Sequence, residues 1–547
     1  MNAPGHTAPP LDVPWDDLVT AALIGTGRRG APTAPRPGQD PALALLDAAA
    51  LHTVRRRAAA LPVAAGRRPE PAPPDPRPPL PEAARRRLAL LLGERAGGGD
   101  RRRTAAPDLV ELLPQWLTAA NAHGYRPPDA LLPGLLDAAR ARTDLRPEAL
   151  AFAGPRGRWL AGLNPQWAYA LRSHPPGPGA ASPVSPASSG PPDATGLDGL
   201  RRVWREGLFA ERLAALTAVR RHDAAAGREL LAGTWATERA EDRQAFLGAL
   251  RDGLSPDDEP FLEAALSDRG RSVRALAAEL LAVLPGSALT ARMTARARTC
   301  VALDQGVVVV EAPHECDDGM RRDGISAKPP SGRGARSWWL SGIVEATPLS
   351  VWPDRLGVPG AAEAVALPVA DGWRPDLHAA WCRAAVRQRD AAWARALLGP
   401  PTTPPAPEGS PGRDPARLLT VLPAAERADW VARFVAAHGL SDAFRPIGVC
   451  AVPWAEPLGR AVVDALEIAR DTGGYPWSFS GVMGLAERCL DPDQADRLAV
   501  LAAPAGADDA PREDAAPPGA AGYWAEAFQR LAGTLRLRAV MRAELAG

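Results

Sequence analysis

The chain has 547 residues, and its 64 Lys and Arg nearly balance its 63 Asp and Glu, which gives a formal net charge of +1 at pH 7. Such a balance leaves no overall field to attract nucleic acid or an anionic lipid surface, so both are disfavoured as partners. There is no run of about 18 apolar residues, and we therefore predict no membrane span. The start, Met1–His6, lacks the basic and apolar regions of a secretory signal.

The 5 cysteines are scattered and form no CxxC pair, so neither a disulfide framework nor a zinc knuckle is expected. We expect a reduced, cytoplasmic protein. The hydrophobic fraction is 46%, supplied mostly by Ala and Leu, which favour helices together with Arg and Glu. We therefore predict an all-α fold.

Residues 1–172 form the predicted N-terminal helical region, which a Pro-rich linker interrupts at 62–81. Its predicted helices are Trp15–Thr26, Pro41–Ala60, Glu82–Glu94, Asp108–His123 and Asp129–Arg142. The segment Gly25–Gly30 matches GxGxxG, but a dinucleotide site needs this motif after a strand and at the start of a helix. We interpret it as the end of a helix and a loop.

Three arginine triplets make the first hundred residues basic: 55–57, 85–87 and 101–103. We interpret them as charges on solvated helix faces and loops. Nucleic-acid binding through them is the third-ranked hypothesis, and it would show a steep dependence on salt. Residues 173–195 are Pro, Ser, Gly and Ala with almost no large apolar side chain, which predicts a disordered linker.

Residues 196–303 form the predicted repeat core. Apolar positions recur there at intervals of 31 residues, in three series: Ala215, Phe246 and Ala277; Val219, Leu250 and Leu281; Leu231, Leu262 and Met293. A period between about 20 and 50 residues is typical of a solenoid, in which each helix pair buries its apolar face against the next pair. The alternative is a plain helical bundle in which the interval is a coincidence.

The last unit of this core has the clearest pattern. Its apolar residues share one helical stripe: Val273, Leu276, Ala277, Leu280, Leu281 and Leu284. We expect Asp268 to cap the helix and Pro285-Gly286 to end it. Together, Asp268, Val273-Arg274, Ala277 and Leu281 resemble the second helix of a HEAT repeat, a family in which the Asp and Arg typically pair between adjacent repeats. We therefore predict an α-solenoid of HEAT-like helical repeats.

An irregular, β-containing insertion is predicted at 304–352. Val307–Val310 is β-branched and predicts a strand. His314–Asp318 offers an imidazole, a thiolate and three carboxylates, but it lacks the second pair of ligands that zinc usually has. We therefore predict no metal ion and no cofactor, and we keep an enzyme site near the acidic loop 314–323 as the alternative function.

A helix that starts near Ala335 carries Trp338 and Trp339. Adjacent helical residues point about 100° apart, so both tryptophans cannot face the same core stripe. Exposed Trp beside Arg is typical of an interaction hot spot. We predict that Arg322, Asp323, Trp338 and Trp339 form a partner-binding surface; the alternative is that both tryptophans pack between helical layers. No GxSxG, Walker A or HExxH motif is present, so no catalytic residue is predicted.

The rest of the chain reads as a helical segment at 353–399, a Pro-rich linker at 400–415 and a C-terminal helical region at 416–547. The predicted helices are His378–Leu398, Ala425–His438, Glu456–Thr472, Ser480–Cys489, Pro492–Ala502 and Tyr523–Leu545.

Several motifs together resemble an uncharacterised actinobacterial family, a domain of unknown function. They are Trp15–Leu18 with Gly25-Thr26, Gly157–Leu160 with Asn164–Trp167, Leu254–Pro256 with Asp258–Glu263, and Arg322–Ile325 with Trp338–Leu340. The resemblance implies an operon shared with a MoxR-type AAA+ ATPase and a von Willebrand A-like protein, and it assigns no catalytic residues. Our leading hypothesis is a non-enzymatic intracellular scaffold that binds a protein partner, with the MoxR system as one candidate.

Overall fold

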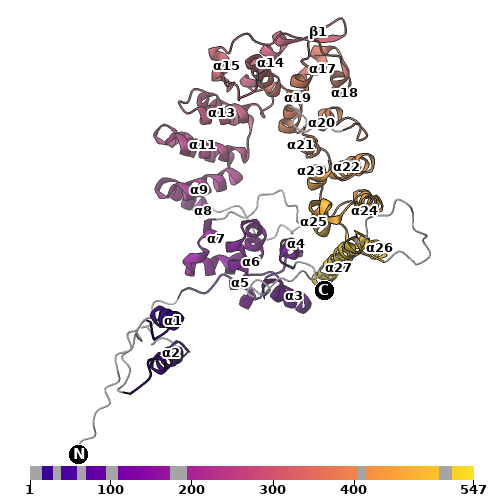
Figure 1. Ribbon diagram of the computed structural model, residues 1–547. Helices are drawn as coiled ribbons and strands as arrows, with labels where there is room; N and C mark the ends of the chain where they lie inside the picture. The colour runs from indigo at the N-terminus through magenta and orange to yellow at the C-terminus, as the bar shows by residue number, and fades with distance from the viewer. Residues whose placement is uncertain are drawn as a thin grey trace, which may run out of the picture. The chain divides into compact units, whose positions relative to one another are not determined.

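The computed structural model describes residues 15–28, 38–57, 69–93, 109–172, 194–404, 414–503 and 520–547. In these residues the fold is all-α apart from one two-stranded sheet, as predicted (Figure 1). None of the described helices is both long and apolar enough to cross a membrane. Of the predicted linkers, residues 62–68, 173–193 and 405–413 lie outside the described residues, and so does the arginine triplet at 101–103. The chain divides into two compact units, Met1–Ala72 and Pro73–Gly547.

The described residues of the first unit form the helices α1 (Trp15–Ile24) and α2 (Pro41–Arg57). They pack through a small apolar core: Leu18, Ala21, Leu45 and Ala48. Gly25, with a φ of +86°, follows α1, and its N–H donates to the carbonyl of Ala21 at 3.0 Å. Because glycine adopts positive φ without strain, this residue ends the helix, as we interpreted the start of the GxGxxG match.

The second unit begins with a group of helices around one core. The helices are α3 (Glu82–Gly93), α4 (Leu109–Ala122), α5 (Leu132–Ala141), α6 (Arg146–Leu163) and α7 (Tyr169–Arg172). Trp116 and Phe152 meet at the centre of this core, edge to face, with their ring centroids 5.7 Å apart.

Seven helices occupy the predicted repeat core. They are α8 (Ala194–Glu206), α9 (Phe209–His222), α10 (Ala224–Thr234), α11 (Ala240–Gly248), α12 (Glu259–Ala265), α13 (Arg271–Leu281) and α14 (Ala288–Cys300). Every residue of the three 31-residue series is buried. The series therefore identifies core positions of these helices, and the repeat itself stays a prediction, because a plain bundle would bury apolar residues as well.

The expected helix cap at Asp268 is wrong. Gly270 is the N-cap residue of α13, and no side chain caps it. Asp268 instead accepts a hydrogen bond from the N–H of Gly270 at 2.7 Å and pairs with Arg243 of α11, also at 2.7 Å. Arg274 reaches the backbone carbonyl of Asp268, not its carboxylate. The carboxylate therefore joins α13 to the helix α11 that packs beside it.

Arg220 of α9 and Asp258, just before α12, form a fully buried ion pair. The guanidinium makes five hydrogen bonds: two to the Asp258 carboxylate, at 2.9 Å each, and three to the carbonyls of Asp252, Ala224 and Leu250. All five of its N–H donors are therefore satisfied without water.

Two strands lie at the boundary between the predicted repeat core and the insertion: β1 (Val301–Asp304) ends the core, and β2 (Val307–Val310) belongs to the insertion. They pair antiparallel, with Val301 opposite Val310. The predicted strand has the observed bounds, but the sequence analysis missed β1. Val308 also bridges to Val369 in parallel, which ties the sheet to the segment before α19. The short helix α15 (Asp318–Arg322) follows.

The remaining helices continue to the C-terminal end. They are α16 (Ala335–Ala346), α17 (Val351–Leu356), α18 (Ala361–Ala366), α19 (Arg374–Gln388), α20 (Ala391–Leu398), α21 (Pro415–Leu419), α22 (Ala424–His438), α23 (Phe444–Gly448), α24 (Glu456–Asp471), α25 (Ser480–Cys489), α26 (Ala495–Leu501) and α27 (Ala520–Ala546). The single helix predicted over His378–Leu398 is wrong, because Arg389 turns left-handed with a φ of +53° and Asp390 caps α20.

The long helix α27 returns to the first helices of the second unit. Glu544 forms an ion pair with Arg87 of α3 at 2.7 Å, across 457 residues of sequence. Met541 and Leu545 are buried in the same core as Leu88 and Trp116. The beginning and the end of this unit therefore share one apolar core.

Candidate functional site

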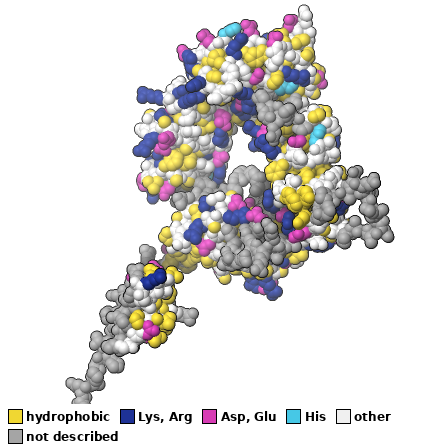
Figure 2. Space-filling view, in the orientation of Figure 1, with side chains coloured by type: hydrophobic (Ala, Val, Ile, Leu, Met, Phe, Trp, Pro, Cys, Tyr) yellow, Lys and Arg dark blue, Asp and Glu magenta, His cyan; other side chains and the backbone are white. Residues whose placement is uncertain are grey.

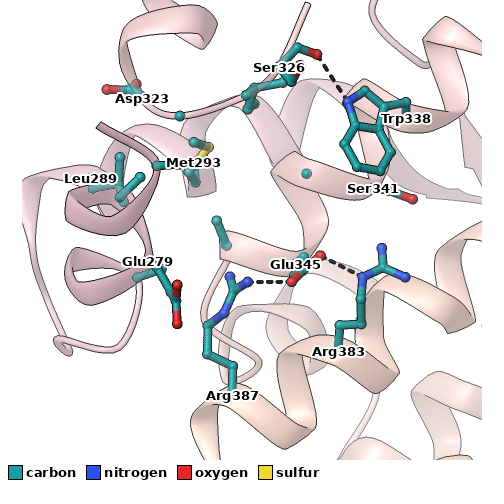
Figure 3. Close-up of a pocket in the computed structure, with 17 residues that line it drawn as sticks. Glu279, Leu289, Met293, Asp323, Ser326, Trp338, Ser341, Glu345, Arg383 and Arg387 are labelled. Atoms are coloured by element: carbon teal, nitrogen blue, oxygen red, sulfur yellow. Dashed lines mark hydrogen bonds and ion pairs between the residues drawn. The ribbon is translucent and has the colours of Figure 1, made fainter. Parts of the chain in front are cut away.

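A cavity of about 270 Å³ opens where the repeat core meets the insertion (Figure 3). Helices α13, α14, α16 and α19 and the segment 323–326 form its walls. We call it the α16 cavity, because α16 contributes Trp338, Ser341 and Glu345 to it. The hydroxyl of Ser341 is buried and has no hydrogen-bond partner among the described residues.

Glu345 holds two arginines of α19 at one side of the α16 cavity. Its carboxylate accepts a hydrogen bond from Nε of Arg383 at 2.6 Å and another from Nη2 of Arg387 (Figure 3). The side chains are 28% exposed for Arg383, 25% for Arg387 and 19% for Glu345. Arg383 and Arg387 are four residues apart, which places them on one face of the helix. The carboxylate thus fixes two guanidinium groups that solvent still reaches.

An apolar wall lies across from this ion triad. Leu289 and Met293 of α14 and Ala278 of α13 belong to it. Gly324, whose φ is +92°, passes so close to α13 that an added Cβ would stand 2.6 Å from the Cβ of Ala278. Only glycine fits such an approach without a clash, so the close contact between the segment 323–326 and α13 depends on this residue.

Asp323, predicted as part of a partner-binding surface, is buried in a salt-bridge network. Its carboxylate accepts hydrogen bonds from Nη2 of Arg292 at 2.7 Å and from Nη1 of Arg296 at 2.6 Å. Arg292 also binds Glu263 of α12 at 3.0 Å. The hydrogen bonds with Asp323 raise the pKa of Arg292, against the opposing effect of burial. The network fastens the insertion to α12 and α14, and Figure 3 shows the Asp323 carboxylate turned away from the cavity.

Trp338 and Trp339 are both half-buried. This burial is intermediate between the two predicted alternatives, an exposed binding surface and packing between helical layers. Their indole N–H groups donate to successive carbonyls, Trp338 to Ser326 and Trp339 to Ala327, at 3.1 Å each. They therefore fix the segment that forms one wall of the cavity. Trp338 lines the cavity itself, and Arg333 lies 5.8 Å from the centre of its ring.

Two of the four predicted surface residues, Asp323 and Trp338, line the α16 cavity. Trp339 and Arg322 lie outside it, and Arg322 is about half exposed and 3.8 Å from Glu263. The sequence analysis missed Glu345, Arg383 and Arg387. The four-residue spacing of the two arginines was visible, but their shared carboxylate lies on another helix, 38 residues before Arg383.

The acidic loop considered as an enzyme site does not converge. His314 is 75% exposed, Asp317 caps α15 by accepting from the N–H of Met320 at 2.6 Å, and Asp318 pairs with Arg321. Within the described ranges, no three His, Cys, Asp or Glu side chains are arranged to hold a metal ion. These side chains therefore make local structural contacts and do not point toward one shared site.

Comparison with protein-family models matches residues 17–545 to a family described as a family of unknown function, DUF5691. No curated protein and no solved structure matches the chain.

Proposed function

We propose that the chain, which belongs to the DUF5691 family, is a non-enzymatic intracellular scaffold that binds a protein partner at the α16 cavity of its helical array. The observation that carries the proposal is the cavity itself. In it, Arg383 and Arg387, both hydrogen-bonded to Glu345, lie across from an apolar wall. A volume of about 270 Å³ is just below the roughly 300–1,000 Å³ of pockets that enclose a drug-sized ligand. It suits one or two side chains of a partner better than a nucleotide-sized cofactor.

The chemistry of the lining supports this proposal. Interaction hot spots are enriched in Trp and Arg and lie in pockets surrounded by packed residues. Trp338, Arg383 and Arg387 supply these side chains, and hydrogen bonds to Ser326 and Glu345 hold each of them in place. Groups that are fixed before binding lose little side-chain entropy when a partner arrives.

The proposed compartment rests on the cysteines. All five are buried, and Cys300, Cys316, Cys450 and Cys489 form no disulfide, as expected for a protein that folds without an oxidising environment. A MoxR-type AAA+ ATPase remains a candidate partner from the family resemblance in the sequence.

Site-specific photocrosslinking tests the proposal. A photoreactive residue replaces Ala275, which is exposed and lines the α16 cavity, in the full chain expressed in its own host. The matched control carries the same residue at Ala437, an exposed alanine of α22. We expect a discrete protein adduct from position 275 that is absent from position 437. If illumination gives no adduct at 275, or the same adducts at both positions, the proposed binding site is wrong.

A further inference from the structure

We infer that the α16 cavity binds the free C-terminal carboxylate of a partner polypeptide whose last side chain is aliphatic. This inference rests on the proposed function, and it names the group that the site recognises.

The arginine pair supplies the carboxylate site. Each guanidinium gives one nitrogen to Glu345, and its other N–H groups meet no acceptor among the described residues. One carboxylate against two guanidiniums leaves one positive charge. The planar forks of arginine match a carboxylate in paired hydrogen bonds, which are stronger than neutral ones. A second carboxylate entering the cavity would complete a two-by-two arrangement of charges.

The other acids near the cavity do not cancel this surplus. Glu279 pairs with Arg251 at 2.7 Å. Asp323 forms ion pairs with Arg292 and Arg296, with its carboxylate turned away from the cavity (Figure 3). Figure 2 shows Lys and Arg side chains gathered at the upper margin of the hollow in the second unit, where Figure 1 places α14 and α19. The charge that remains available to a ligand is therefore positive.

The apolar wall and the small volume select a chain terminus over an internal acidic residue. A terminal residue carries its carboxylate and its side chain on the same Cα, so one residue can meet the arginines and also cover Leu289 and Met293. An internal Asp or Glu needs a neighbouring residue for the apolar contact and must bring a peptide backbone through the cavity. A cavity of about 270 Å³ accommodates the first arrangement more readily.

Random hexapeptide libraries test the inference with the purified full chain. One library has free C-terminal carboxylates, and the other has the same sequences with amidated ends. We expect capture of the free-acid library, with enrichment of Leu, Ile, Val or Met at the last position, and at least about tenfold weaker capture of the amidated library, as expected for loss of a charge-assisted hydrogen-bonded pair.

The variant Arg383→Lys/Arg387→Lys keeps the positive charges beside Glu345 and removes the guanidinium forks, and unchanged thermal melting verifies its fold. It should lose the preference for free acids, whereas the control Arg433→Lys, on an exposed face of α22, should retain it. Equal capture of the two libraries by the unmodified chain, or a preference that survives the double substitution, would overturn the inference. Either result would leave an adduct at position 275 intact, so the proposed function and this inference can fail separately.

Discussion

The buried ion pair between Arg220 and Asp258 gives the sharpest stability prediction. Both side chains are fully buried, and all five guanidinium donors have acceptors within the protein. Substitution of Asp258 by Ala removes two of these acceptors together with the carboxylate that pairs with Arg220 among the described residues. The positive charge stays buried, because three backbone carbonyls still hold the guanidinium between α9 and α12.

Removing one partner of a buried ion pair costs about 3–5 kcal/mol, since the remaining charge is left without compensation. At 1.36 kcal/mol for each factor of ten, the local opening equilibrium should rise by roughly two to four decades. The neighbouring pair of Arg221 and Asp252 is a matched control: its separation is similar, 3.0 Å, but its side chains are 34% and 39% exposed. Loss of an exposed pair costs only about 0.2–1 kcal/mol.

Hydrogen exchange read by mass spectrometry on peptides from α9 and α12 measures the effect. Asp258→Ala should abolish most of the protection there, and Arg221→Ala should leave it nearly unchanged. The double variant Arg220→Met/Asp258→Ala should lose less protection than Asp258→Ala alone, because it removes the fully buried charge of Arg220. Both variants also separate Arg228, whose side chain is 22% exposed, from Asp258, so this second pair does not distinguish them. Equal effects of the buried and exposed pairs, or strictly additive effects at residues 220 and 258, would refute the reasoning.

Three further outcomes are expected. Leu231→Ala, on the 31-residue series, should destabilise the chain by about 2–5 kcal/mol, whereas Leu230→Ala, which is only half-buried, should cost clearly less in chemical unfolding. Gly324→Ala should lower the melting temperature through a cost of about 1–3 kcal/mol, because it combines a φ of +92° with a Cβ contact of 2.6 Å to Ala278; an unchanged melting temperature would contradict this. Burial raises the pKa of the Cys450 thiol from 9.0 to about 11, so a thiol-reactive dye at pH 8 should label it only in denaturant. Because the folded pKa lies above the unfolded one, the stability from keeping this thiol neutral is present below pH 9 and is lost as the pH rises through about 11. The difference in unfolding free energy between the unmodified chain and Cys450→Ala should therefore change between pH 9 and about 11. A difference that stays constant over this range would contradict the raised pKa.

Much of the fold was accessible from the sequence, because helical periodicity is a local signal. Helices α24 and α25 were predicted to within one residue, and the 31-residue series identified buried positions. The misses have local causes too. Arg389 adopts a left-handed conformation that favours Gly or Asn, so its residue type gave no sign of the break between α19 and α20. Strand β1 has only four residues, and polar Asp304 ends it.

The candidate site was harder to predict, because it depends on tertiary contacts. Asp323 and Trp338 were selected as charged and aromatic residues in an irregular segment, and both line the cavity. Their roles differ from expectation: Asp323 is a buried anchor, and Trp338 is half-buried and holds the segment 323–326 in place. The triad of Glu345, Arg383 and Arg387 forms only when α16 and α19 pack together, and no spacing within one helix reveals that pairing.

The shared core of the first and last helices has a consequence for synthesis. Leu88 and Trp116 emerge from the ribosome long before Met541 and Leu545, which complete the core around them. Until α27 has been translated, the apolar surfaces of α3 and α4 that contact it stay exposed. The helices between α4 and α27 can already pack against their neighbours. The nascent chain therefore has an extended period in which its earliest helices are open to chaperones, and a ribosome that stalls before α27 would release a chain whose defect lies at its beginning.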